Sequence, residues 1–229
     1  MKYLILLPSL LASLTAAHFT INYPPSRSTD AKTQSEFPCG GFSRPSIRTK
    51  ISLHSPSFPI SVDMGHDQTA IRFLLAVGSA PGTNYNITLS KTFRVEGLGE
   101  FCVPDVVLSE DILGTKLEDE LNMTLQVQAN GHPDGGLYAC ADLQLTTEPV
   151  SGPSKSTFKN NTGVVAVPFT GAAADRNANV STPEVWPQGG EDTKNKGESH
   201  APFLTGGSAL QAASWGVLGV SALGSLAIW

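Results

Sequence analysis

The chain carries few charged residues and no cluster of basic ones. Of its 229 residues, 15 are Lys or Arg and 20 are Asp or Glu, so the formal net charge is -5. A surface that binds nucleic acid needs grouped Lys and Arg side chains to neutralise phosphates, and here these residues are scattered singly. The composition therefore argues against a nucleic-acid partner.

Long apolar runs are also missing, except at the two ends. Residues 1–17 combine one Lys, a short apolar run and small residues, which predicts a secretory signal peptide cut before His18. The run is shorter than the about 20 apolar residues that cross a bilayer. Residues 207–229 form a terminal tail without charge after a small-residue cluster, which predicts a glycosylphosphatidylinositol (GPI) anchor attached at Gly206. A C-terminal transmembrane anchor is the alternative, and both place the protein outside the cell, on the plasma membrane or in the cell wall.

A single folded domain is expected over residues 18–147. Residues 148–206 are rich in Ser, Thr, Asn, Pro and Gly, which predicts a flexible glycosylated stalk, with the apolar run 164–167 as a candidate last edge strand. Short, β-branched segments separated by turns indicate an all-β antiparallel sandwich, with one helical turn near 109–113. The expected strands are 19–23, 60–64, 70–77, 85–89, 101–108, 121–129 and 137–145.

Covalent modifications are expected because the protein is exported. Oxidising conditions should pair two of the three cysteines, and we favour Cys102–Cys140, both in predicted strands, over Cys39–Cys140. Surface N-linked glycans are predicted at the four Asn-x-Ser/Thr triplets. Their asparagines are Asn86, Asn122, Asn160 and Asn179.

Signal cleavage would give His18 two nitrogens that point to one place, the new α-amino group and the imidazole Nδ1. An α-amino group titrates near pH 8, so a metal ion displaces its proton at modest cost. A second imidazole in the same plane would complete a T-shaped histidine brace, and tetragonal nitrogen ligands favour copper(II). The alternative is that His18 only marks the cleavage point.

Four further histidines could supply the second imidazole. His200 lies in the predicted stalk, and His54 lies among Ser and Pro residues with no acidic neighbour. His66 follows a predicted strand in a tight turn, from which its side chain can reach the N-terminal residue. We therefore predict His66 as the ligand and His54 as a surface residue. His132 is a candidate for the third ligand.

A third ligand is expected from the Gly-rich segment 130–143. Asp134 lies at the end of its loop and can approach a metal axially. Asp142 lies deeper in a predicted strand, and His132 is in the loop. Asp134 is preferred, with Asp142 or His132 as alternatives and the absence of a third ligand also open.

Five motifs in chain order resemble the fungal copper acquisition factor family, the lytic polysaccharide monooxygenase-like copper-binding proteins. They cover His18-Phe19 with Tyr23-Pro24, then residues 37–41, 64–67, 96–102 and 134–143. The resemblance implies an immunoglobulin-like sandwich, one copper(II) ion in a brace of His18 and His66, a carboxylate from Asp134, and a GPI anchor. The chain departs from the expected pattern at Phe158, near which a fourth Cys is anticipated, and this departure leaves Cys39 without an obvious partner.

Two functions are weighed beside a structural role in the cell wall. One is surface capture of copper for transfer to an importer, and the other is oxidative cleavage of a polysaccharide. A glycan-oxidising enzyme needs a flat, often aromatic surface and open copper positions, but Trp186 lies in the stalk and Trp215 and Trp229 in the tail. A carboxylate at the metal would also occupy a position and favour copper(II). We therefore predict a copper-binding protein that is not an enzyme.

Overall fold

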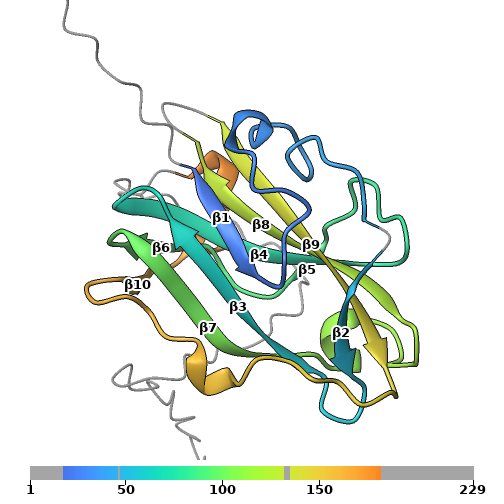
Figure 1. Cartoon of the computed structure of the whole chain (residues 1–229). Helices are drawn as coiled ribbons and strands as arrows, with labels where there is room; N and C mark the ends of the chain where they lie inside the picture. The colour runs from blue at the N-terminus through green and yellow to red at the C-terminus, as the bar shows by residue number, and fades with distance from the viewer. Residues whose placement is uncertain (1–17, 46, 132–134, 182–229) are drawn as a thin grey trace, which may run out of the picture.

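The computed structural model describes residues 18–45, 47–131 and 135–181, which form two packed β-sheets (Figure 1). The elements in chain order are β1 (Phe19–Tyr23), η1 (Ala31–Thr33), β2 (Thr49–Ser52), β3 (Ser57–Met64), β4 (Gln68–Val77), β5 (Ile87–Thr88), β6 (Phe93–Glu96), β7 (Gly99–Val107), α1 (Glu110–Leu113), β8 (Asn122–Asn130), β9 (Gly136–Thr146), η2 (Lys155–Thr157), β10 (Val165–Pro168), α2 (Ala172–Asp175) and η3 (Ala178–Val180).

The expectation of an all-β sandwich is confirmed. The smaller sheet has the order β1-β3-β7, and the larger has the order β10-β6-β4-β8-β9-β2, with β5 paired to β4. All pairs are antiparallel except β2 with β9, which run parallel. Among the described strands, β1 is at the edge of the smaller sheet and pairs only with β3.

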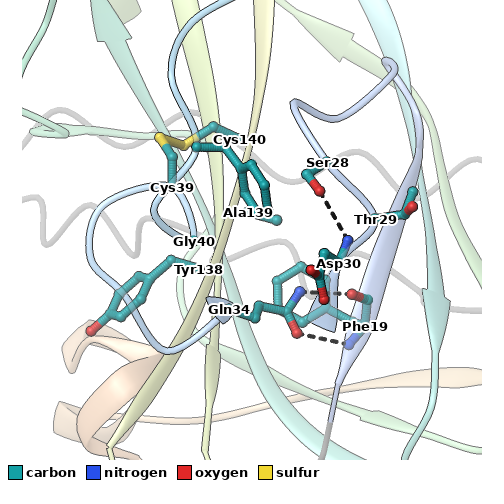
Figure 2. A pocket seen from close by; sticks show the side chains of 11 residues that line it. Phe19, Ser28, Thr29, Asp30, Gln34, Cys39, Gly40, Tyr138, Ala139 and Cys140 are labelled. Carbon is teal, nitrogen blue, oxygen red and sulfur yellow. Dashed lines mark hydrogen bonds between the residues drawn. A yellow bond between two sulfur atoms is a disulfide. The ribbon is translucent and has the colours of Figure 1, made fainter. Parts of the chain in front are cut away.

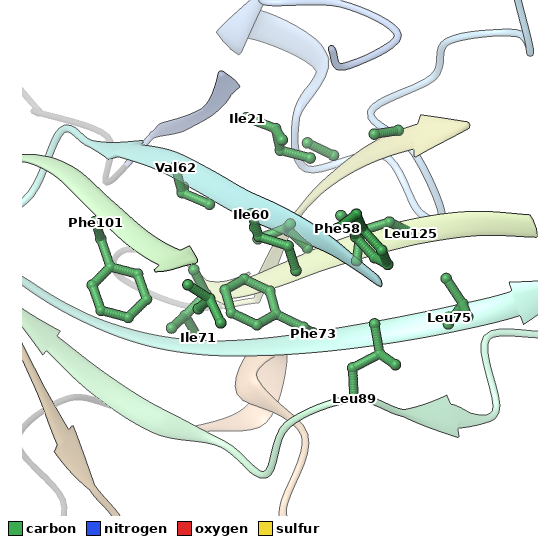
Figure 3. Packing of buried hydrophobic residues seen from close by; sticks show 14 of the residues in the cluster. Ile21, Phe58, Ile60, Val62, Ile71, Phe73, Leu75, Leu89, Phe101 and Leu125 are labelled. Atoms are coloured by element: carbon green, nitrogen blue, oxygen red, sulfur yellow. The ribbon is translucent and has the colours of Figure 1, made fainter. Parts of the chain in front are cut away.

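The core fills the space between the two sheets, as Figure 3 shows. Alternation along β8 sends Leu125 and Val127 inward, and β3 supplies Ile60 and Val62 from the facing sheet, all at most 1% exposed. The outer face of β8 is buried too, because loops cover it. Gln126, for example, donates through Nε2 to the Pro38 carbonyl at 2.8 Å.

Folded structure continues beyond residue 147, where the sequence analysis ended the domain. β10, at the apolar run that predicted an edge strand, pairs with β6. After it, Phe169, Ala173 and Ala174 pack against Ala70 on the outer face of β4. The low apolar content of this segment concealed its packing, because small alanine side chains suffice to cover a sheet face at close range. Residues 182–229, including Gly206, His200 and the rest of the predicted stalk and tail, lie outside the described residues, as do residues 1–17.

The favoured disulfide was wrong, since the structure joins Cys39 to Cys140, with Cα atoms 5.1 Å apart. Cys140 pairs across strands with Gln126 and shares its outward face on the larger sheet. Cys102 lies between the core residues Phe101 and Val103 on β7, so it points outward from the smaller sheet. The two cysteines are therefore on opposite outer faces of the sandwich, and a disulfide requires Cα atoms within about 7 Å.

Cys102 is buried and carries a free thiol. Its Sγ donates to the Lys159 carbonyl at 3.4 Å, and its N–H donates to Asn160 Oδ1 at 2.8 Å. The segment in which a fourth Cys was anticipated thus lies against Cys102 and not against Cys39. Phe158 in that segment instead packs on Tyr23, with ring centroids 5.3 Å apart.

The four predicted glycosylation sites have different surroundings. Asn86 is exposed, whereas Asn122 donates from Nδ2 to Ser79 Oγ at 3.2 Å. Asn160 donates to the Val164 carbonyl at 3.0 Å. Asn179 donates to Tyr138 Oη at 3.1 Å. Glycosylation at each stays a prediction.

Within the described part of the chain, no helix is long and apolar enough to span a bilayer.

Candidate metal centre

Three chain turns or ends meet at one end of the sandwich, at the upper left of Figure 1. They are the start of β1, the β3–β4 turn, and the end of β8 with the start of β9. The β6–β7 turn is joined to the β3–β4 turn, since Gly97 N–H donates to the Asp67 carbonyl at 2.8 Å. The predicted ligands His18 and His66 belong to the first two segments, and Asp134 lies between β8 and β9 in the sequence.

His18 and His66 are brought together by the pairing of β1 with β3. Phe19 lies opposite Met64, and Gly65 N–H donates to the His18 carbonyl at 3.1 Å. His66 is therefore the next residue after the backbone contact of His18. A Cβ on Gly65 would lie only 2.5 Å from the His18 carbonyl oxygen, so the strands can approach this closely only because residue 65 has no side chain.

The ring of His66 is oriented by its own turn. Its Nδ1 lies 3.0 Å from the Gln68 carbonyl and 3.4 Å from Asp67 Oδ1, and the side chain is 29% exposed. The Gln68 N–H also lies 3.5 Å from Nδ1, but the carbonyl and carboxylate oxygens lie closer and can only accept, so these contacts favour the proton on Nδ1. The lone pair is then on Nε2, the arrangement in which a histidine binds a metal through one nitrogen and is held through the other.

The β8–β9 hairpin closes near the same end. Gly131 N–H donates to the Gly135 carbonyl at 2.8 Å, which fixes the distance between the two ends of the segment 132–134. Asp134 and His132 themselves lie outside the described residues. Asp134 as a ligand therefore stays a prediction, supported by the position of the residues that flank it.

Asp142, the alternative carboxylate, already has its partners. Arg27 contacts both carboxylate oxygens, with Nε at 2.7 Å and Nη2 at 2.9 Å. Arg48 Nη1 lies 3.3 Å from Oδ1, to which Thr124 Oγ1 also donates at 2.8 Å. The Asp142 side chain has no exposed surface. A buried, charge-paired carboxylate is structural, and a metal could bind it only by displacing an arginine.

His54 lies at the opposite end of β3 from His66. It is exposed in the turn before Ser57, whereas His66 follows Met64 at the other end of the strand. Eight extended residues span about 25 Å, so His54 cannot share a metal with His18. Among the residues described here, no group of three or more His, Cys, Asp or Glu side chains is arranged to hold a metal. The pair of His18 and His66 would need the α-amino group or a residue from 132–134 to complete a site.

Two residues at this end were not predicted as functional. Gly65 was predicted only as part of a motif, although a glycine at the end of a strand, directly before His66, can indicate that another backbone segment approaches closely. Gln34, whose side chain is hydrogen-bonded to Phe19, gave no signal, because a glutamine in a polar loop reads as a solvated residue.

The protein is thus an all-β sandwich in which two histidines, His18 and His66, lie near each other at one end. The sequence matches the family described as Copper acquisition factor BIM1-like over residues 16–163. The chain belongs to this family.

Three curated proteins are similar to this chain in sequence. Copper acquisition factor BIM1 of Cryptococcus neoformans var. grubii is 34% identical over 163 residues, which are 69% of this chain and 72% of that one. The lytic polysaccharide monooxygenase-like protein X325 of Yarrowia lipolytica is 29% identical over 73% of this chain and 63% of its own. An uncharacterized protein of Aspergillus fumigatus is 50% identical over 95% of both chains.

Proposed function

We propose that this protein binds one copper(II) ion at the cell surface through an N-terminal histidine brace and serves copper acquisition. His18 supplies its α-amino nitrogen and its imidazole, and His66 supplies Nε2. The observation that carries the proposal is the hydrogen bond between Gly65 and His18, which sets the two histidines side by side at the end of the sandwich. Family membership supports copper as the ion.

The donor set fits copper(II) better than softer or harder ions. Imidazole and amine nitrogens suit copper(II), and a carboxylate from Asp134 would add negative charge that stabilises the higher oxidation state. Deprotonation of the α-amino group makes binding pH-dependent, so a proton is released as copper enters and taken up as it leaves. This exchange is a direct means of binding and handing on an ion without any oxidation of a substrate.

The transfer role is preferred to an enzymatic one. The sequence holds no Trp between residues 18 and 181, so the folded part lacks the residue that most often forms a flat glycan-stacking surface. The family description names acquisition and no reaction. The anchor at Gly206 would keep the site at the outer leaflet, beside an importer that could receive the copper.

The ligand set is tested by copper(II) titration and electron paramagnetic resonance on the protein processed to begin at His18. One added Gly before His18 should weaken binding by at least about tenfold, since the amine becomes a peptide nitrogen. His66→Ala should abolish the brace spectrum, while Asp134→Ala should keep three nitrogens and change the geometry. His54→Ala is the matched control and should change neither affinity nor spectrum. Unchanged binding after the Gly addition would refute the brace.

Location and use are tested in cells. A phosphatidylinositol-specific phospholipase should release the protein, and cells lacking it should grow poorly only when copper is withheld. If copper limitation has no effect and the copper-loaded protein oxidises a cell-wall glycan, the enzymatic function would replace the one proposed.

A further inference from the structure

The side chain of Gln34 hydrogen-bonds the outer edge of β1. Phe19 has its N–H and its carbonyl on the side away from β3, where the described part of the chain adds no further strand to the smaller sheet. The Gln34 amide fills that place, with Nε2 donating to the Phe19 carbonyl at 2.7 Å and Oε1 accepting from Phe19 N–H at 3.4 Å. Figure 2 shows the two bonds side by side. The amide thus takes the role of a neighbouring strand for the residue next to His18.

Gln34 is itself fixed to the larger sheet. Gln34 is buried, with only 5% of the residue exposed. Its carbonyl accepts the Tyr138 N–H at 2.7 Å, close to the start of β9 and three residues beyond Gly135. The loop that carries it is tied to β9 again by the disulfide from Cys39.

These contacts place His18 between two fixed points. On one side, the Gly65 backbone sets its position relative to His66. On the other side, Gln34 connects Phe19, the residue after His18, to β9. Without Gln34, the Phe19 backbone would lose both of these hydrogen bonds, and residues near a chain end that lose such bonds tend to fray.

We propose that Gln34 is a positioning residue for the copper site: it fixes the His18 end of β1 relative to β9, and so sets the geometry in which the His18 amine and imidazole meet a metal. This inference rests on the proposed function. Gln34 does not touch the metal, and its effect passes through the Phe19 backbone. Residues that orient ligands in this way typically change metal affinity by about 10- to 100-fold when they are replaced.

The test compares Gln34→Met with Gln126→Met in the processed protein. Methionine keeps the length and volume of glutamine but cannot bond the Phe19 backbone. Gln126 is a matched control, because it is fully buried and its amide bonds the same loop at Pro38 but does not contact Phe19. Each variant is examined by copper(II) titration, by paramagnetic resonance, and by hydrogen exchange of the Phe19 amide without metal.

Gln34→Met should bind copper(II) about tenfold or more weakly, show an altered spectrum, and exchange the Phe19 amide faster without metal. Gln126→Met should match the unaltered protein in all three measurements. If Gln34→Met does not fold, Gln34→Glu takes its place, since it keeps the acceptor for Phe19 N–H and loses the donor to the carbonyl. It should show the same three changes, and an unaltered affinity and spectrum would overturn the inference.

Failure of this inference is distinguishable from failure of the proposed function. If His66→Ala loses copper binding while a folded Gln34 variant keeps the unaltered affinity and spectrum, Gln34 has no positioning role and the brace stands. If Gln126→Met has the same defect as Gln34→Met, general loosening of the loop explains both, and the specific role is also overturned. If His66→Ala binds copper normally, the brace itself fails.

Discussion

Gly65→Ala tests the contact on which the arrangement of His18 and His66 depends. The new Cβ would lie 2.5 Å from the His18 carbonyl oxygen, while ordinary contacts begin at 3.4 Å, so the strands must separate by about 0.9 Å. Residue 65 also donates the 3.1 Å hydrogen bond that would be stretched. The substitution therefore disturbs the backbone contact between Gly65 and His18 without touching either imidazole.

The expected cost follows from these two effects. A lost backbone hydrogen bond costs about 1 kcal/mol, and overpacking at a tight contact costs about 1–3 kcal/mol. A loss of about 2–4 kcal/mol should lower the Tm of a domain of this size by about 4–16 °C. Copper(II) affinity should fall by about tenfold or more, because His18 would be displaced relative to His66.

Thermal unfolding and copper titration measure the two effects separately. Gly152→Ala is the control, since its Cβ would meet only Tyr23 Oη at 3.7 Å, an ordinary contact. A Gly65→Ala protein with unchanged Tm and unchanged copper spectrum would refute the close approach. A lower Tm with unchanged copper binding would show that the contact between Gly65 and His18 does not position the ligands.

Three further predictions concern groups remote from the proposed ligands. Asp142→Ala should cost about 3–5 kcal/mol in thermal unfolding, because it leaves Arg27 buried without its carboxylate, while the copper spectrum of the folded protein stays the same; a lost spectrum in folded protein would restore Asp142 as a ligand. Cys39→Ser should cost about 4 kcal/mol by opening a loop between residues 101 apart in sequence, and peptide mapping without reduction should find Cys39 joined to Cys140. Burial raises the pKa of the Cys102 thiol to about 11, so iodoacetamide at pH 8 should modify it slowly in the folded protein and readily after unfolding. The raised pKa favours the protonated folded state, so this contribution to stability is complete below pH 9 and is lost as the pH rises towards 11; rapid alkylation at pH 8 would contradict the burial.

Strands with a clear alternation were predictable from the sequence. The segment 19–23 coincides with β1, and the helical turn near 109–113 is α1, with Ser109 accepting from Ile112 N–H at 3.3 Å as its cap. β2 and β6 were missed because each has only four residues and includes a charged side chain. Such short strands form because neighbouring strands bind them, and neighbours that are distant in sequence leave no local signal.

The disulfide shows where sequence reasoning lacked the needed information. Cys102 and Cys140 both lie in strands, as predicted, but the two strands belong to different sheets. Pairing depends on which face each side chain takes, and this is set by register with Ser61 for Cys102 and with Gln126 for Cys140. No property of the isolated segments reveals that the two faces are opposite.

The candidate ligands were easier to propose from the sequence than the residues that hold other parts of the structure in place. The predicted signal cleavage point suggested His18 and the strand-end turn suggested His66, since both are local features, and their role as ligands stays a prediction. Gln34 bonds Phe19 across a separation of 15 residues in sequence, and Arg27 bonds Asp142 across a separation of 115. Such partners are fixed by the fold, so an aspartate that could have been a ligand is seen to be structural only when its arginines are in place.

The state of the cysteines bears on which copper ion the proposed site would take. Copper(I) prefers soft thiolate ligands, and copper(II) prefers nitrogen and oxygen. Cys39 and Cys140 are consumed in the disulfide. Cys102 keeps its proton at neutral pH, because burial raises its pKa to about 11, and its Sγ is bonded to the Lys159 carbonyl. None of the three cysteines therefore offers a thiolate to compete with the nitrogens of His18 and His66. Under the proposed function the site would hold copper(II), so delivery of the ion as copper(I) would require a one-electron reductant.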